Sequence, residues 1–266
     1  MDLAGRKALL TGATGGLGRA IATALAERGA VLVLSSRKPE ALEQLASELP
    51  GEDHRVLTSD LAEPGAAEQL AAAAGEVDVL VANAGLPATG RLPEFSSEEM
   101  VRALRVNLEA PMLLARALEP GMVERGSGHM VFVSSLSGKS ATPLSSVYNA
   151  TKFGLRGFAL GLRADLDPVG IGVSLVSPGT IRDAGMYADS GADPIPGLGT
   201  GSPAQVAKAV LSAIEKNRVE VTVAPIQQRL LAHFALASPG IAVKIASGGA
   251  GQKAAANVAA GQANKR

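Results

Sequence analysis

Tyr148 and Lys152 stand four positions apart in the run Tyr-Asn-Ala-Thr-Lys. On a helix this spacing puts a phenol and an ammonium group on the same face. The ordinary pKa of tyrosine is about 10, and a neighbouring cation favours the ionised phenolate. Two opposite unit charges about 4 Å apart attract each other by roughly 4 kcal/mol at an effective dielectric of about 20. If nothing opposed it, this attraction would lower the tyrosine pKa by up to about three units. The pair could thus make Tyr148 a proton donor near neutral pH, although helix surfaces also carry such pairs for packing and solubility alone.

A glycine-rich turn lies near the N-terminus, between an apolar run at 7–10 and an Ala-rich stretch at 19–28. Glycines allow positive φ angles and the close approach of a ligand. The free N–H groups at the start of the following helix favour a phosphate. We therefore predict a strand, a phosphate-binding turn and a helix, against the alternative of a flexible turn in a chain with 31 glycines. The candidate residues of the turn are Gly12, Thr14, Gly16, Leu17 and Gly18.

The apolar run at 31–34 is expected to form the next parallel strand, and it leads into Ser35-Ser36-Arg37-Lys38. An acidic residue at this distance from the glycines would bind the ribose hydroxyls of NAD, whereas arginine can pair with the 2′-phosphate of NADP. Position 36 is serine and Arg37 follows. The pattern favours NADP(H) bound through Ser36 and Arg37 and leaves NAD(H) open. The alternative is that the two cations are solvated loop charges.

Four further motifs follow in order. Asn83-Ala84-Gly85 comes after an apolar run, Asn107 lies on an expected helix, a serine cluster at 134–137 precedes Gly138, and Pro178-Gly179 ends another apolar run. Together with the glycine turn and the Tyr-x-x-x-Lys pair, they resemble the short-chain dehydrogenase/reductase (SDR) family in its single-domain form, over about residues 5–225.

The resemblance implies roles for these residues. Ser135, thirteen residues before Tyr148, matches the family's catalytic serine, with Ser134 and Ser137 as alternatives. Tyr148 would be the general acid/base, Lys152 would also hold the nicotinamide ribose, and Asn107 would position a water. Further cofactor contacts are implied for Asn83, Ala84, Gly85, Pro178, Gly179, Asp60 and Leu61.

Two of these assignments rest on weaker matches. Asp60 resembles an aspartate that contacts adenine, but an ordinary loop acid or helix N-cap explains it as well. The family's threonine four residues after the Pro-Gly glycine is replaced by Asp183. We therefore expect backbone groups around Ile181 to bind the carboxamide instead.

The implied reaction is hydride transfer between NADP(H) and a carbonyl compound, an aldehyde or ketone, or the corresponding alcohol. The alternative is a non-catalytic NADP(H)-binding redox sensor or interaction module. No metal is expected, because the three histidines lie far apart and the chain has no cysteine. The glycine-rich segment at about 184–201 is expected to form a substrate lid, and its apolar side chains favour a small hydrophobic substrate.

The alternation of apolar strands and Ala/Leu-rich helices predicts one α/β domain with a Rossmann-like, doubly wound, mostly parallel sheet of seven strands and helices on both faces. We assign 1–225 to this oxidoreductase domain, 226–246 to a C-terminal helical segment and 247–266 to a disordered tail. By analogy with the family, a homodimer or homotetramer is expected.

Charge limits the possible partners. The 25 basic and 25 acidic residues balance, which gives no reason to expect nucleic-acid binding. No acidic residue follows Glu220, however, while five basic ones do. The segment from 226 onward could therefore touch an anionic membrane weakly, or pack over the substrate cleft or against another subunit. Since the N-terminus lacks an apolar signal core, we expect a cytoplasmic protein, with peripheral attachment to a membrane as the alternative.

Overall fold

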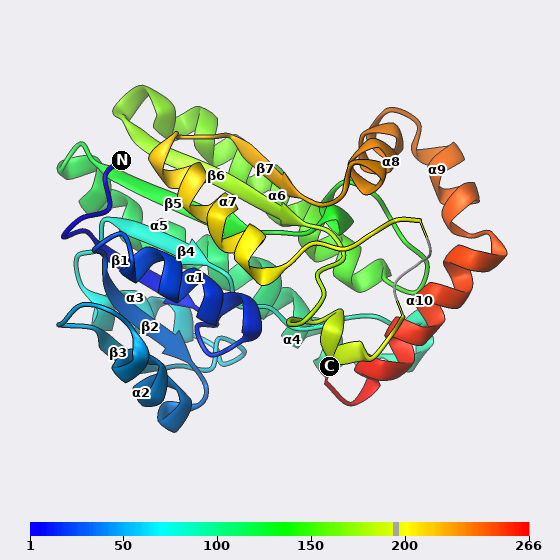
Figure 1. Cartoon of the computed structure of the whole chain (residues 1–266), viewed down its shortest axis with the longest axis horizontal. Coiled ribbons are helices and arrows are strands. Elements are labelled where there is room, and N and C mark those ends of the chain that lie inside the picture. The colour runs from blue at the N-terminus through cyan, green and yellow to red at the C-terminus, as the bar shows by residue number, and fades with distance from the viewer. Residues whose placement is uncertain (194–196, 266) are drawn as a thin grey trace.

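A single parallel sheet of seven strands forms the centre of the protein, in the order β3-β2-β1-β4-β5-β6-β7 (Figure 1). The computed structural model describes residues 1–193 and 197–265. The strands are β1 Lys7–Thr11, β2 Val31–Ser36, β3 Arg55–Thr58, β4 Val79–Ala82, β5 Gly128–Val133, β6 Ile171–Pro178 and β7 Glu220–Val223. This confirms the Rossmann-like, doubly wound sheet. The strand order reverses between β1 and β4, and ligands of such sheets bind in the crevice at that point.

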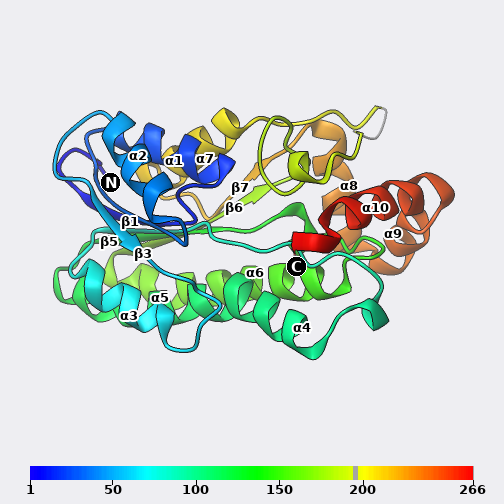
Figure 2. The same cartoon turned by 90° about the horizontal axis from the view of Figure 1, so that it is seen from below.

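Helices cover both faces of the sheet (Figure 2). One face carries α1 Gly16–Ala26, α2 Pro39–Glu48 and α7 Pro203–Glu215, and the other carries α3 Ala66–Ala74, α4 Ser97–Leu104, α5 Ala110–Glu124 and α6 Ser146–Leu166. A π-helical turn, η2 Arg105–Glu109, joins α4 to α5. The short 3-10 helices are η1 Leu92–Glu94, η3 Leu136–Gly138, η4 Asp167–Val169, η5 Ala188–Ser190 and η6 Ala263–Lys265.

The side chains of the strands alternate between the two faces of the sheet and form one hydrophobic core on each face. Successive side chains of a strand point to opposite faces, so Leu10 and Leu32 pack toward α1 and α7 while Leu9 and Leu80 pack toward α3 and α5. All of these side chains are fully buried. Because both faces of every central strand are covered, the sheet is a rigid base for the loops at its carboxyl edge.

The C-terminal residues differ from the expectation of a disordered tail. The chain continues from β7 into α8 Ile226–Ala237, α9 Pro239–Ala246 and α10 Gly249–Gln262. α10 packs against η5 in the expected lid, and Gln262 is buried there. Small side chains allow this close contact: a Cβ on Gly261 would collide with the backbone oxygen of Ser190. Within the described ranges, no helix has the length and apolar character needed to cross a membrane.

Candidate active site

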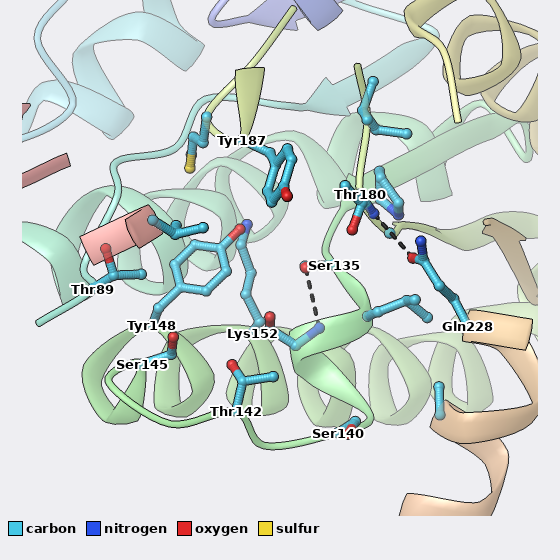
Figure 3. A pocket seen from close by; sticks show the side chains of 18 of the residues that line it. Thr89, Ser135, Ser140, Thr142, Ser145, Tyr148, Lys152, Thr180, Tyr187 and Gln228 are labelled. Carbon is cyan, nitrogen blue, oxygen red and sulfur yellow. Dashed lines mark hydrogen bonds between the residues drawn. The ribbon is translucent and has the colours of Figure 1, made fainter. Parts of the chain in front are cut away.

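Eight of the predicted site residues line one cavity of about 590 Å³ at the carboxyl edge of the sheet (Figure 3): Leu17, Asn83, Ser135, Tyr148, Lys152, Pro178, Gly179 and Ile181. Its floor comes from the ends of β4, β5 and β6 and from the first turns of α6. Residues 184–187 and Leu198 of the expected lid, together with the three C-terminal helices, close the opposite side, while residues 194–196 of that expected lid lie outside the described residues. Tyr148, Lys152 and Ser135 all line this cavity.

The glycine turn between β1 and α1 is shaped by close backbone contacts. Gly12 has a φ angle of +65°, and a Cβ there would lie 2.8 Å from the Cα of Ala84. A Cβ on Gly18 would collide with the backbone oxygen of Gly12, and one on Gly16 would collide with Ala184 of the lid. The turn therefore needs glycine at all three positions, and no side chain caps the N-terminus of α1. Such uncapped N–H groups are donors suited to a phosphate.

The end of β4 holds the glycine turn in place. The Asn83 amide nitrogen donates to the backbone oxygens of Thr11, at 3.0 Å, and Gly12, at 3.2 Å. The backbone N–H groups of Asn83 and Ala84 each donate to the Thr11 hydroxyl at 3.1 Å. Thr11 was not predicted as a site residue, although its place at the end of β1, next to Gly12, was a signal for such a role.

Tyr148 and Lys152 lie one turn apart in α6. The Lys152 ammonium is 5.7 Å from the centre of the Tyr148 ring and donates to the Val133 oxygen at 3.2 Å. Burial lowers the pKa of Lys152 to about 8. Burial also raises the pKa of Tyr148 to about 12, against a smaller opposite effect of its hydrogen bond with Ser135. The expected lowering of the tyrosine pKa by Lys152 is thus not seen in the protein alone, because desolvation of the phenolate outweighs the nearby cation.

The three serines before Gly138 occupy different surroundings. The Ser134 hydroxyl is buried and donates to the backbone oxygen of Lys152 at 3.4 Å. Ser135 is half-buried, accepts a hydrogen bond from the N–H of Ser137 at 3.1 Å, and lowers the pKa of Tyr148 against the larger effect of burial. Gly138 packs against the same Lys152 carbonyl, 2.7 Å from where its Cβ would be. Of the three serines, Ser135 is the one whose side chain affects the pKa of Tyr148, and its catalytic role stays a prediction.

Asn107 lies in the π-helical turn and is fully buried. Its side chain accepts from the N–H of Leu86 at 2.7 Å and donates to the oxygen of Leu86 at 2.9 Å. A Cβ on Gly85 would lie 3.3 Å from Asn107 Oδ1 and 4.0 Å from Lys152 Nζ. Asn107 therefore fixes the chain after β4 beside Lys152, and its expected part in a water link stays a prediction.

The Pro178-Gly179 bend ends β6 and leads to Ile181. Ile181 is buried, lines the cavity and pairs with Gly201 in an isolated bridge. That bridge uses the oxygen of Thr180 and the N–H of Arg182, so the backbone groups of Ile181 itself have no partner among the described residues. The Asp183 carboxylate instead pairs with Arg182 at 3.1 Å, at the surface.

The residues expected near the adenosine end lie at the ends of β2 and β3. The Ser36 hydroxyl accepts from the N–H of Lys38 at 3.2 Å, and Arg37 is exposed, with no hydrogen bond or ion pair to another described residue. Asp60 accepts from the N–H of Ala62 at 3.0 Å, as an ordinary loop acid would, and Leu61 is buried. These positions belong to the same carboxyl edge as the glycine turn.

Sequence analysis missed the two glutamines that hold the covering segments. Gln228 of α8 accepts from the N–H of Thr180 at 3.1 Å and donates to the oxygen of Gly199 at 2.8 Å. Gln262 of α10 accepts from the Thr89 hydroxyl and donates to the Met186 oxygen, both at 2.7 Å. Neither residue belongs to a local motif, so no sequence signal pointed to it.

Charge and metal ligands are sparse in this site. Lys152 is the only charged side chain among the described residues that line the cavity. Among residues 1–193 and 197–265, no group of three histidine, aspartate or glutamate side chains is placed to hold a metal ion.

Comparisons with known proteins agree with the geometry. Residues 6–194 match a protein family described as short chain dehydrogenase. The chain is 35% identical to bovine (Bos taurus) dehydrogenase/reductase SDR family member 7B over 88% of its length and 78% of that protein. It is 36% identical to the ketoacyl reductase HetN of Nostoc, over 83% and 79% of the two chains. A short-chain dehydrogenase from Sphingobium yanoikuyae, solved with NADPH, has a TM-score of 0.78 and 27% identity, over 89% of this chain and 94% of that one.

Proposed function

The chain belongs to the short-chain dehydrogenase/reductase family, and from this premise we propose that it is an NADP(H)-dependent oxidoreductase that interconverts a carbonyl compound and an alcohol. The observation that carries the proposal is the meeting of Tyr148, Lys152 and Ser135 at one largely apolar cavity. A packing pair on a helix surface would not need a buried ammonium, yet Lys152 is only 3% exposed.

The three side chains take complementary roles around a carbonyl group. The Tyr148 phenol gives its proton to the carbonyl oxygen during reduction, or its phenolate takes the proton of the alcohol during oxidation. The Ser135 hydroxyl donates a hydrogen bond to the same oxygen and stabilises the negative charge that develops there. The Lys152 ammonium, with one protein acceptor at Val133, keeps donors for the ribose hydroxyls of the nicotinamide and stabilises the phenolate form of Tyr148. The bound nicotinamide supplies or accepts the hydride.

The residues present fit a dinucleotide. Any side chain at Gly12 or Gly18 would fill the turn where the backbone must approach a pyrophosphate, and the start of α1 is uncapped. Arg37, beside Ser36, has no hydrogen-bond or ion-pair partner among residues 1–193 and 197–265, and an NAD-specific site would carry an acid here. We therefore propose a preference for NADP(H), as in the Sphingobium relative whose structure contains NADPH.

The cavity points to a neutral, hydrophobic substrate. Its walls include Leu136, Met186, Leu231, Phe234 and Val258, and Lys152 is its only charged side chain among the described residues. A cationic substrate would lose its hydration there without gaining an ionic partner, and an anionic one would meet only Lys152, whose ammonium is assigned here to the nicotinamide ribose. We propose an apolar aldehyde or ketone, or the corresponding alcohol.

The test is NADPH oxidation with a panel of hydrophobic aldehydes and ketones, comparing the wild type with Tyr148→Phe. Because the variant loses the phenolic hydroxyl that carries the acidic proton and keeps the ring, we expect turnover to fall by at least about 10²-fold while NADPH still binds. Tyr187→Phe is the matched control: it removes the other tyrosine hydroxyl, which bonds the Asp193 oxygen within the lid, and should change turnover far less. Equal turnover in the wild type and Tyr148→Phe would contradict the mechanism. Tight NADPH binding with no turnover of any substrate would favour the redox sensor.

A further inference from the structure

The hairpin of α8 and α9 turns an apolar surface toward solvent. Its large apolar side chains outside the cavity lining, here called the C-terminal apolar surface, are 41–63% exposed: Ile226, Leu230, Leu236, Ile241 and Val243. None of the eight residues of α9 is buried. Helices this short are marginal in water unless another surface packs against them. Clustered exposed apolar side chains of this kind mark a site of contact with a protein or a membrane.

The charge of this region favours a membrane over a protein as the partner of this surface. After Glu220 the sequence contains five basic residues and no acidic one. Arg229 of α8 and Lys244 of α9 are exposed on the hairpin itself, and Lys253 follows on α10. A second copy of the chain meeting this surface through two-fold symmetry would bring these cations together, which is unfavourable. An anionic lipid surface would meet both the apolar and the cationic side chains with favourable contacts.

The position of the hairpin also suits a bilayer. Both views place α8, α9 and α10 together at one end of the molecule, away from β1, β2 and β3 (Figures 1 and 2). At twelve and eight residues, α8 and α9 are too short to span a bilayer but can lie in the plane of its surface. The inner side of the same hairpin lines the cavity, through Ala232, Ala242 and Ala246.

We propose that the C-terminal apolar surface docks the protein onto an anionic lipid bilayer. Leu230, Ile241 and Val243 enter the boundary between headgroups and acyl chains, while Arg229 and Lys244 contact lipid phosphates. The hairpin then stands between the bilayer and the cavity. This docking does not depend on the proposed function, since it needs neither cofactor nor turnover.

Vesicle co-sedimentation tests the proposal with the full chain. We expect the wild type to bind phosphatidylcholine vesicles that contain phosphatidylserine, and to bind pure phosphatidylcholine at least about tenfold more weakly, because each cation near an anionic surface contributes roughly a fivefold gain. High salt should weaken binding by screening this attraction. Replacement of the apolar contacts, in Leu230→Gln/Ile241→Gln/Val243→Gln, should abolish sedimentation. Arg229→Glu/Lys244→Glu should weaken binding to the anionic vesicles by at least about tenfold.

Matched variants separate docking from a general change in hydrophobicity or charge. Leu92→Gln/Val169→Gln/Val219→Gln removes three exposed apolar side chains elsewhere, and Arg116→Glu/Lys208→Glu reverses two exposed cations elsewhere. Both should bind anionic vesicles like the wild type. The proposal is overturned if the wild type does not bind these vesicles, or if either hairpin variant binds them as well as the wild type does. A lower assembly mass of the apolar hairpin variant in solution, with vesicle binding intact, would assign the surface to a second copy instead.

Discussion

Burial and charge act in opposite directions on the phenol of Tyr148. Burial raises the pKa of Tyr148 to about 12 and lowers that of Lys152 to about 8. At neutral pH the phenol therefore keeps its proton, which is the form needed to reduce a carbonyl, and the ammonium is mostly charged. In the proposed mechanism, alcohol oxidation needs the phenolate, which the charge of Lys152 and a hydrogen bond from Ser135 would stabilise.

We also propose that single residues decide the choice of cofactor. We expect Arg37→Ala to weaken NADPH binding by at least about tenfold, since a charge-assisted hydrogen bond to the 2′-phosphate contributes roughly 1.5–3 kcal/mol. NADH, which lacks that phosphate, should bind the variant nearly as well as it binds the wild type. Fluorescence titration of both cofactors measures the difference, and Lys38→Ala is the control for a general loss of positive charge in this loop. An equal loss for NADPH and NADH would mean that Arg37 does not read the phosphate.

At the level of elements, the parts predicted from the sequence are those with local signals. The glycine turn, the Tyr-x-x-x-Lys helix and the apolar strands each carry their pattern within a few neighbouring residues. Such patterns fix backbone conformation and the buried face, and parallel strands then bring the motifs to one edge of the sheet.

α10 could not be predicted in this way. Its sequence is dominated by glycine, alanine and polar residues, without an apolar stripe, so it is typical of a tail. The helix is instead held by contacts across the chain: Gln262 bonds Thr89, 173 positions away, and Gly261 lies against Ser190. The glycine and alanine residues of α10 give no helix pattern in the sequence, but their small size permits this close packing.

The Gln262 contacts predict how α10 controls the cavity. Gln262→Ala removes one buried and one partly buried hydrogen bond, each contributing about 1 kcal/mol, and takes away the Gln262 partner of the Thr89 hydroxyl and of the Met186 oxygen. We expect faster amide hydrogen exchange in α10 and η5, and a higher KM for hydrophobic substrates with a smaller change in kcat. Gln252→Ala, at an exposed position of the same helix, should leave exchange and KM unchanged. Unchanged exchange in Gln262→Ala would mean that α10 is held by other contacts.

At the scale of the whole molecule, a second exposed apolar region lies on the sheet face opposite α1 and α7. Met112 of α5 and Phe153 of α6 are 38% and 40% exposed, and Leu104 of α4 is 41% exposed. These three helices share one face of the sheet (Figure 2), where a second copy could cover all of them at once. Unlike the C-terminal apolar surface, this face includes acidic residues, such as Glu109 beside Arg105. Two copies that meet here can therefore place opposite charges against each other. We therefore propose that the expected homo-oligomer forms through α4, α5 and α6.

Light scattering after size-exclusion chromatography tests this assignment. The wild type should have the mass of a dimer or tetramer, and Met112→Glu/Phe153→Glu should have a lower mass, because two carboxylates would be buried without partners in the interface. Val169→Glu/Val219→Glu introduces the same charges at exposed apolar positions on other elements and should keep the wild-type mass. Vesicle binding by Met112→Glu/Phe153→Glu should persist, since docking uses the other surface. A monomeric wild type, or an unchanged mass in this variant, would contradict the assignment and leave these side chains as ordinary exposed apolar groups.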